Sequence, residues 1–350
     1  MKIPHSKPTL STKEMKAVSA VIKSAYVAPG AQVRQFEQHF AKRHKTQDAV
    51  AVNSGTSALH MALAALNIKA KDEVIIPSYA CSALLNAVLY TGAKPIIADV
   101  DETDFNLSVE SVRKHLSRKT KAVIAVHSFG LAADLSALKR LGVTIIEDCA
   151  QSVGAKYGPR LVGTIGEIGV FSFYATKMIT TAEGGMVISR SRSLIKNIRD
   201  IIDYDNRSQF KLRYNYKMSD MQAAMGSVQL KQLSRFIARR RELAERYCEH
   251  LDPLKCVLPI DLNQRRHIFY RYVIRLSGKH TAANIINRLN QAGIEARAPV
   301  FKPLHQLYKS HPCPAADALV KSAVSLPIYP TLSNTQVDFI CKKLSALLSK

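Results

Sequence analysis

The feature that most constrains the fold is a repeating pattern that begins at Ala49. Short apolar segments alternate with turns and helical segments, in the stretches AVAVNSGTSALHMALAAL, EVIIPSYACSALLNAVLYTG, KPIIADV, KAVIAVHSFG and VTIIEDCAQS. Strands that alternate with helices form parallel sheets, and strands buried on both faces have continuous apolar sequences. We therefore predict an α/β fold with a mainly parallel sheet and helices on both faces.

Two helices are expected before this pattern. Ser11 and Glu14 form a capping box, which predicts a helix that runs to about Ala25. Its apolar residues Met15, Val18 and Ile22 form one stripe, and we expect the helix to pack against something larger. A second helix should carry Phe36 and Phe40. Together these helices form an N-terminal arm.

A smaller unit is expected after the repeating pattern. The segments IGVFSFY and GMVIS complete the sheet. Helices are predicted from about Leu194 to Ile202 and from Ser219 onward. The helix that begins at Ser219 is long enough to bridge two domains. A strand over 269–276 and a helix over 282–292 follow, with Gly293 as its stop. We predict a large α/β domain at residues 1–240 and a small C-terminal α+β domain at residues 241–350.

Composition excludes several classes of protein. With 47% hydrophobic and 22% charged residues the chain is not disordered, and no apolar run has the length of a signal peptide core or a membrane span. The six cysteines form no CxxC or zinc-spaced cluster, so we expect reduced thiols, no metal and a cytoplasmic protein that does not bind membranes.

A formal net charge of +23 indicates an anionic partner. The basic residues are scattered and accompany no nucleic-acid-binding motif, so we expect a phosphorylated small molecule rather than nucleic acid. The alternative is a basic binding or regulatory module whose function depends on charge, and nucleic-acid affinity at physiological salt would distinguish the two.

Two turns after predicted strands carry polar groups. Asn53 to Ser57 lies between a strand and a helix, where backbone N–H groups and hydroxyls can bind an anion, although simple helix capping is the commoner use of such residues. Asp148 and Gln151 follow another buried strand, and ligands bind at that end of parallel strands. Asp148 can hold a protonated ring nitrogen or cap a helix, and Gln151 can orient a ring substituent or be a solvated turn residue.

Lys177 is the candidate for covalent chemistry. Most lysines are solvated surface charges, but Lys177 stands between the apolar strand FSFY and the turn TTAEGG, whose glycines allow close backbone approach. A lysine in such surroundings can form a Schiff base. With an anion site and an acidic ring partner, this pattern is typical of a pyridoxal phosphate (PLP) site.

The chain resembles the nucleotide-sugar aminotransferases of the DegT/StrS type, which are fold-type-I PLP enzymes. The resemblance rests on FEQHFAKRH, NSGTSALHMAL, DVDETDFNL, EDCAQSVGAKYG, VGTIGEIGVFSFYATKMITTAEGGM, YNYKMSDMQAAMGSVQL, PLHQLY and SLPIYP, which occur in the family's order over nearly all of the chain. It implies the PLP-transferase fold and assigns the cofactor to the large domain.

The resemblance also implies residue roles. Lys177 is the lysine that binds PLP covalently, Asp148 the partner of the pyridine nitrogen, and Gln151 the neighbour of the phenolic oxygen. The phosphate would be held by Gly55, Thr56, Ser172 and, from the neighbouring subunit, Asn215. This implies a homodimer with shared active sites.

The sequence departs from the family at two positions. Cys81 stands where family members usually have an aromatic residue that stacks on the cofactor, and Tyr79 is an alternative only if the loop takes a different path. Ala182 replaces glycine in the TTGEGG motif, which matters only if that position needs a positive φ.

The resemblance implies transfer of an amino group, usually from glutamate, to a keto-sugar attached to a nucleotide. Alternatives are a cyclitol or other cyclic ketone as acceptor, or PLP-dependent sugar dehydration, although dehydratases of this family have histidine at the lysine position. Candidate substrate-binding residues are Lys211, Arg213, Lys217 and His305, each of which can instead be a solvent-facing or structural residue.

Overall fold

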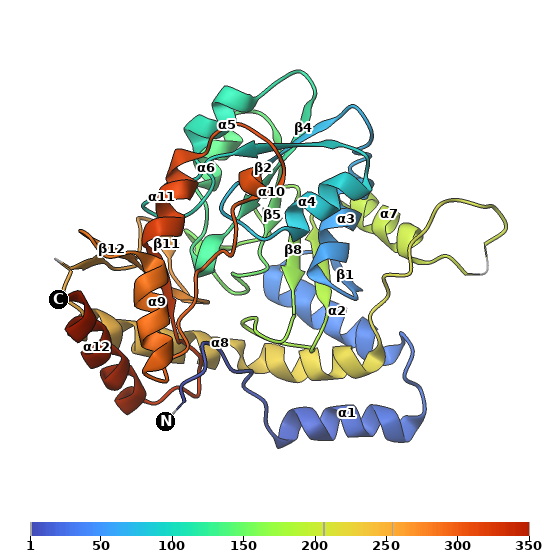
Figure 1. Cartoon of the computed structure of the whole chain (residues 1–350). Helices are drawn as coiled ribbons and strands as arrows, with labels where there is room; N and C mark the ends of the chain where they lie inside the picture. Colours follow the sequence, from blue (N-terminus) through green and yellow to red (C-terminus); the bar gives the residue numbers. More distant parts are fainter. Residues whose placement is uncertain (1, 206, 254, 350) are drawn as a thin grey trace.

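The computed structural model describes residues 2–205, 207–253 and 255–349. Its centre is a seven-stranded sheet with the order β1-β9-β8-β5-β4-β2-β3 (Figure 1). Neighbouring strands from β8 to β3 are parallel, whereas β9 is antiparallel to both β8 and β1. The predicted mainly parallel sheet is confirmed. Its strands are β1 (Asp48–Val52), β2 (Glu73–Pro77), β3 (Lys94–Ala98), β4 (Thr120–Val126), β5 (Thr144–Asp148), β8 (Ile168–Ser172) and β9 (Gly185–Ser189).

Helices cover both faces of this sheet, as predicted. On β1, Val50 and Val52 join the apolar cluster of α3, α4 and α7, whereas Ala49 and Ala51 join the cluster of α2 and α8 on the other face. Alternate residues of one strand are therefore buried on opposite faces. The helices are α2 (Ala31–His44), α3 (Gly55–Ala65), α4 (Ala83–Tyr90), α5 (Val109–His115), α6 (Leu135–Lys139), α7 (Arg192–Ile202) and α8 (Asp220–His250).

The N-terminal helix α1 (Thr12–Ser24) packs along α8, but not through the predicted stripe (Figure 1). Its buried residues are Glu14 and Val21, and Glu14 accepts a hydrogen bond from the Gln229 side chain at 2.7 Å. Met15 is 66% exposed and Ile22 57%. The face that packs on α8 therefore carries Glu14 and Val21, and two residues of the stripe are exposed.

A second apolar core lies around the C-terminal part of α8. There Tyr247, Tyr272 and Leu344 are fully buried, and Ile3 from the N-terminus joins them. This core takes in the antiparallel sheet β10-β12-β13 with α9 and α12, whereas the buried residues of α10 and α11 belong to the apolar cluster beside the large sheet. The elements of this part of the chain are β10 (Cys256–Val257), β12 (Tyr272–Leu276), β13 (Ala323–Leu326), α9 (Ala282–Gln291), α10 (Leu304–Leu307), α11 (Pro314–Ser322) and α12 (Asn334–Leu348).

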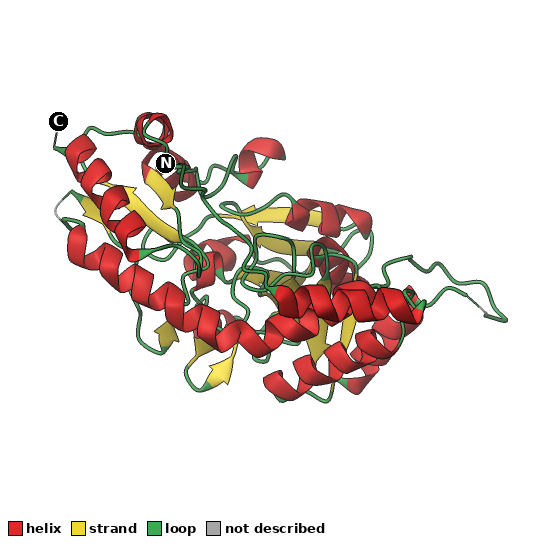
Figure 2. Ribbon diagram, turned by 90° about the horizontal axis from the view of Figure 1, so that it is seen from below, coloured by secondary structure: helices red, strands yellow, loops and turns green. Residues whose placement is uncertain are grey.

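The long helix α8 runs without interruption from the large sheet to this second core (Figure 2). The predicted domain boundary at residues 240 and 241 lies within it and stays a prediction. Strand β12 begins at Tyr272 rather than at the predicted Phe269, because Phe269 has a left-handed backbone with φ of 51°. The guanidinium group of Arg240 also donates hydrogen bonds to the carbonyl oxygens of Phe269 and Tyr270, both at 3.1 Å.

The remaining regular elements are short. They are the helical turn η1 (Ser128–Gly130) and a three-stranded sheet of β6 (Lys156–Tyr157), β7 (Arg160–Leu161) and β11 (Arg265–Arg266). Within the described ranges, no helix is both long enough and apolar enough to cross a membrane.

Candidate active site

A cavity of about 240 Å³ opens where β4, β5 and β8 end and α3 begins. This is the end of a parallel sheet at which ligands are expected. Seven predicted site residues from separate parts of the sequence line this cavity. They are Gly55, Thr56, Cys81, Asp148, Gln151, Ser172 and Lys177.

The start of α3 forms one end of the cavity. Ser54 caps the helix and accepts a hydrogen bond from the Ser57 N–H at 3.0 Å. The first N–H groups of a helix have no partner within it, so those of Gly55 and Thr56 are available to an anion. A Cβ on Gly55 would lie 2.7 Å from the Ser172 Cβ. Glycine therefore lets α3 approach β8, and a phosphate fits the cradle between them.

Asp148 ends β5 and is only 6% exposed. Its Oδ1 accepts a hydrogen bond from the Ala150 N–H at 2.9 Å. Burial raises the pKa of Asp148, and the nearby positive charge of Lys177 partly opposes this rise. A buried carboxyl group that lines a cavity in this way is suited to a cationic ring nitrogen.

Lys177 follows β8, and its backbone N–H donates to the Tyr174 carbonyl oxygen at 2.9 Å. Its side chain is half-buried and lines the cavity, and the Nζ atom lies 5.2 Å from the centroid of the Tyr270 ring. Lys177 and Asp148 thus line the same cavity.

The turn after Lys177 has a strained residue. Ala182 has a φ of 68°, in the left-handed region, and its N–H donates to the Thr180 hydroxyl at 2.9 Å. The substitution of alanine for the family's glycine therefore does place a side chain at a position that favours glycine.

Gln151 is oriented by the backbone of η1. Its side-chain oxygen Oε1 accepts a hydrogen bond from the Phe129 N–H at 3.0 Å. The amide nitrogen is then the group left for a ligand, which suits an acceptor such as a phenolic oxygen.

The loop that carries Cys81 contributes no aromatic side chain to the wall of the cavity. Cys81 is exposed and lines the cavity. Tyr79 is 2% exposed, and its ring lies 6.1 Å from that of Phe105 and 6.5 Å from that of Phe129. Tyr79 therefore points into the protein core and does not replace the missing aromatic wall.

Asn215 and two predicted substrate residues lie away from this cavity. With Lys211 and Arg213, Asn215 lines a separate hollow of about 580 Å³. Both cations bind Asp200, Lys211 Nζ at 2.8 Å and Arg213 Nη2 at 3.0 Å, and together they lower the pKa of Asp200 to about 2.

The other two predicted substrate residues also have partners within the protein. Lys217 Nζ lies 3.6 Å from the Asp205 carboxylate. His305 Nδ1 lies 2.6 Å from the Ser78 hydroxyl, and its Nε2 lies 3.2 Å from Asp317. These contacts give His305 a structural role whether or not it touches a substrate.

Glu147 and His127 form a buried network beside the site. Glu147 accepts hydrogen bonds from His127 Nε2 at 3.0 Å and from the N–H groups of Gly163, Ile165 and Gly166. Donor atoms of His127, Glu147 and Cys149 lie within 4.8 Å of one another. His127 Nδ1 also accepts a hydrogen bond from the Ala133 N–H. The ring nitrogens of His127 and the carboxylate of Glu147 are therefore engaged in hydrogen bonds rather than in binding a metal.

Sequence reasoning missed Tyr270, which contacts Lys177. It belongs to the segment HIFYRY, far from Lys177 in the chain, and is brought close when Ile268 N–H and Arg271 N–H bond the carbonyl oxygens of Gly130 and Phe129. No motif in the sequence signals this contact.

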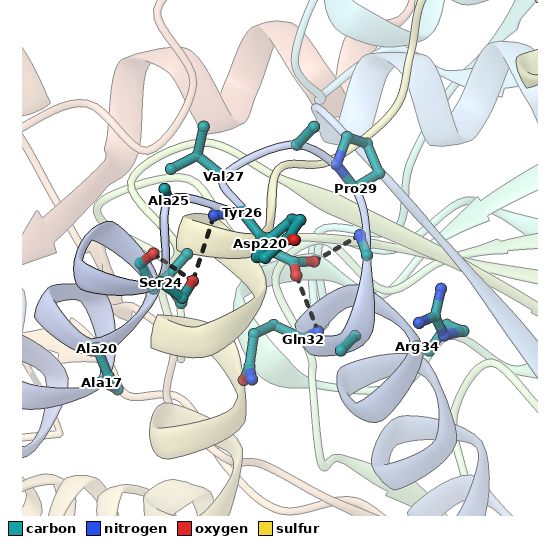
Figure 3. A pocket seen from close by; sticks show the side chains of 14 residues that line it. Ala17, Ala20, Ser24, Ala25, Tyr26, Val27, Pro29, Gln32, Arg34 and Asp220 are labelled. Atoms are coloured by element: carbon teal, nitrogen blue, oxygen red, sulfur yellow. Dashed lines mark hydrogen bonds between the residues drawn. The ribbon is translucent and has the colours of Figure 1, made fainter.

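A hollow of about 750 Å³ lies elsewhere, between the end of α1, the start of α2 and Asp220 (Figure 3). The two Asp220 carboxylate oxygens accept hydrogen bonds from the N–H groups of Gly30, Gln32 and Val33, at 2.7, 3.1 and 3.0 Å. Asp220 thus caps α2 in place of a side chain from Gly30.

A cavity that combines an anion cradle, a buried acid and a lysine has the groups that a PLP enzyme needs. The chain matches the DegT/DnrJ/EryC1/StrS aminotransferase family over residues 8–345, and it belongs to this family. It is an aminotransferase whose cofactor is PLP, so the prediction of family and cofactor is confirmed.

Similar proteins are known over almost the whole length. GDP-perosamine synthase of Escherichia coli O157:H7 is 35% identical, with 99% of each chain covered. GDP-perosamine synthase of Vibrio cholerae is 33% identical, with 97% of each covered. The crystal structure of the aminotransferase TlmJ from Streptoalloteichus hindustanus has a TM-score of 0.93 and 29% identity, and covers 100% of this chain and 99% of that one.

Proposed function

We propose that this protein transfers an amino group from glutamate to the keto group of a nucleotide-linked sugar. The observation that carries the proposal is the presence of Lys177 and Asp148 in one cavity with the open start of α3. The names of the relatives, GDP-perosamine synthases in two bacteria, support a nucleotide-linked sugar as acceptor.

Each lining residue has a proposed role. Lys177 binds the cofactor carbonyl and, when released, moves a proton at its Nζ atom. Asp148 faces the ring nitrogen, and Gln151 faces the phenolic oxygen. Gly55, Thr56 and Ser172 hold the phosphate, and Cys81 forms part of the wall beside the ring. PLP supplies the electron sink for this chemistry when it is bound.

The nucleotide must lie mainly outside the cavity. A volume of about 240 Å³ is smaller than that of most sites for drug-sized ligands, so the cofactor takes up most of it. We propose that the keto-sugar enters at the mouth, near Tyr174 and Glu183. Lys211, Arg213 and Lys217 remain candidates for the diphosphate, which would have to compete with Asp200 and Asp205. A role of His305 in sugar binding also remains a proposal.

We propose a homodimer with shared active sites. Asn215 does not line the cavity of its own chain, and the loop before it extends away from the sheet (Figure 1). This loop carries Phe210, which is 98% exposed, and Tyr26 near the end of α1 is 83% exposed. Such exposed apolar side chains support contact with a second copy, in which Asn215 reaches the partner's phosphate.

Mixed dimers test this arrangement. Lys177→Ala and Asn215→Ala should each lower activity when purified alone, whereas a heterodimer of the two variants contains one intact site and should regain activity. The matched control is a mixture with Lys177→Ala in both chains. Heterodimers that form but recover no activity would contradict the shared site.

The substrate assignment is tested by half-reactions. The purified protein is loaded with glutamate, and keto-sugar nucleotides are screened for conversion of the aminated cofactor back to PLP. We expect conversion with a nucleotide-linked keto-sugar and none with Lys177→Ala. Reaction with a cyclitol ketone alone would show that the sugar assignment is wrong.

Two further proposals concern location and domains. All six cysteines are free thiols, which supports a cytoplasmic location and can be tested by cell fractionation. The separate core around Tyr247 and Tyr272 supports a small domain at residues 241–350. Limited proteolysis should then cut in the loops between the two cores.

A further inference from the structure

Arg271 is a half-buried cation with no acid partner among the described residues. It directly precedes β12, and its Nη1 atom donates a hydrogen bond to the Pro299 carbonyl oxygen at 2.9 Å. Its guanidinium carbon lies 5.6 Å from the centroid of the Tyr270 ring. A guanidinium group has five N–H donors in a planar fork that fits a carboxylate, and one contact with a carbonyl oxygen leaves most of that fork for a ligand.

Four other arginines of low exposure each pair with a carboxylate. Their side chains are 10–22% exposed, and the nitrogen–oxygen distances are 2.6–3.2 Å in the pairs Arg213–Asp200, Arg241–Asp261, Arg265–Asp104 and Arg275–Glu102. A charge that is withdrawn from water is costly unless an opposite charge compensates it. The unpaired Arg271 is therefore suited to an anion that comes from outside the chain.

Two chains of contacts place Arg271 beside the cavity that Lys177 lines. The Tyr270 ring contacts both cations, since Lys177 Nζ lies 5.2 Å from the centroid to which the Arg271 distance refers. In addition, the Arg271 N–H donates to the Phe129 carbonyl oxygen at 3.2 Å, and the Phe129 N–H donates to the lining residue Gln151 at 3.0 Å. Arg271 is thus fixed behind the wall of the cavity from two sides.

The charges around Arg271 are mainly positive. Burial lowers the pKa of the neighbouring His5 to about 3, and the charges of Arg271, Arg297 and Arg240 act in the same direction. Glu295 opposes them, but its carboxylate is paired with Arg297. An anion that reaches Arg271 is therefore attracted by more cations than there are acids to repel it.

The position of Arg271 favours a carboxylate of the amino-acid donor over a phosphate. The donor must bring its amine to the cofactor at Lys177, and an amino acid carries its α-carboxylate close to that amine. Glutamate carries a second carboxylate farther along its side chain. The candidates for the diphosphate of the acceptor, Lys211 and Arg213, line a separate hollow instead.

We propose that Arg271 binds a carboxylate of the amino-acid donor while the amine of the donor lies at the cofactor beside Lys177. This inference rests on the proposed amino transfer and deepens it, because it assigns a site for the donor. Two parallel N–H···O bonds from the fork fix the orientation of a carboxylate as well as its position. Lysine at this position would keep the charge but lose the fork.

The test measures the binding of glutarate, a dicarboxylate without an amine, to the PLP-loaded protein by calorimetry. The Kd should rise about tenfold or more in Arg271→Gln and by less in Arg271→Lys, because a charge-assisted hydrogen bond is lost in the first and only its geometry in the second. In the half-reaction, the KM for glutamate should rise by a similar factor while kcat at saturating glutamate changes much less.

The matched control is Arg275→Gln. Arg275 lies on β12 and pairs with Glu102 at 3.2 Å, so this variant removes a nearby cation but should keep the wild-type Kd and KM. If the Arg271 variants do not fold, the wild-type protein is modified with the arginine reagent phenylglyoxal and followed by peptide mass spectrometry. Saturating glutarate should slow modification of Arg271 and leave that of Arg275 unchanged.

The outcomes separate this inference from the proposed function. A wild-type protein that binds no glutarate, a Kd unchanged in Arg271→Gln, or modification of Arg271 that glutarate does not slow would overturn the donor site. Weaker binding of guanosine diphosphate with unchanged binding of glutarate would place Arg271 in the nucleotide site and also overturn it. A wild-type protein that binds glutarate as expected but converts no keto substrate would contradict the proposed function and leave the carboxylate site standing.

Discussion

Gly55 and Ser172 meet where the first turn of α3 lies against the end of β8, and a Cβ on Gly55 would lie 2.7 Å from that of Ser172. We predict that Gly55→Ala forces these two segments apart and opens the phosphate cradle. Overpacking of this kind costs about 1–3 kcal/mol of folding free energy. Affinity for PLP should fall by about tenfold or more, as measured by absorbance titration, and the melting temperature should fall as well.

A double variant is the control for this steric argument. Gly55→Ala combined with Ser172→Gly removes the opposing Cβ, so it should recover thermal stability but not the affinity that depends on the serine hydroxyl. A single Gly55→Ala variant that binds PLP as tightly as the wild type would contradict close packing at this contact.

Replacement of Ala182, in the turn after Lys177, should increase the stability of the protein. Its φ of 68° is a conformation that costs an L-residue about 1–2 kcal/mol, and glycine adopts it without that penalty. We predict that Ala182→Gly raises the free energy of unfolding by about 1 kcal/mol, measured by urea denaturation.

The control is Ala20→Gly, on the exposed side of α1, which should lose about 1 kcal/mol because glycine destabilises a helix interior. Loss of stability in Ala182→Gly would show that the left-handed backbone carries no strain.

The sequence predicted the large sheet because its strands are continuous apolar segments, and local pattern suffices for such elements. It also predicted that the turn from Asn53 to Ser57, Asp148 and Lys177 contribute to one site, because groups at the ends of parallel strands meet at one edge. The place of Gly55 and Ser172 as phosphate ligands was implied by the family resemblance instead. The orientation of α1 could not be predicted in this way. Its inward face carries Val21 and Glu14, and Glu14 is held there by a hydrogen bond from Gln229, far along the chain.

The contact of Tyr270 with Lys177 could not be predicted from the sequence for a related reason. Its position depends on Gly130 and on carbonyl groups held by Arg240, so no local pattern encodes it. The start of β12 was misplaced because the aromatic residues Phe269 and Tyr270 suggest a strand, which the left-handed backbone of Phe269 interrupts.

Asp148→Asn tests the proposed partner of the ring nitrogen. The amide has nearly the same shape but no negative charge, so it cannot balance a protonated ring. We expect PLP still to bind and kcat to fall roughly 100-fold or more in the half-reaction with glutamate. The surface variant Asp203→Asn should keep wild-type kcat. A value of kcat close to wild type at full PLP occupancy would exclude this role for Asp148.

Glu147 should control stability at acid pH. Burial raises its pKa, but hydrogen bonds from His127, Gly163 and Gly166 outweigh this and hold the pKa below the usual value of 4.5. Its stabilising effect is therefore complete above that pH and is lost as the pH falls through the lower value in the folded protein. We predict that Glu147→Gln lowers the free energy of unfolding at pH 7 by about 3 kcal/mol, because the amide presents a donor to backbone N–H groups. The stability of this variant should also depend less on pH below 4.5 than that of the wild type. Urea denaturation across this range measures both effects, and Glu110→Gln, at an exposed pair with Lys114, should match the wild type at neutral pH.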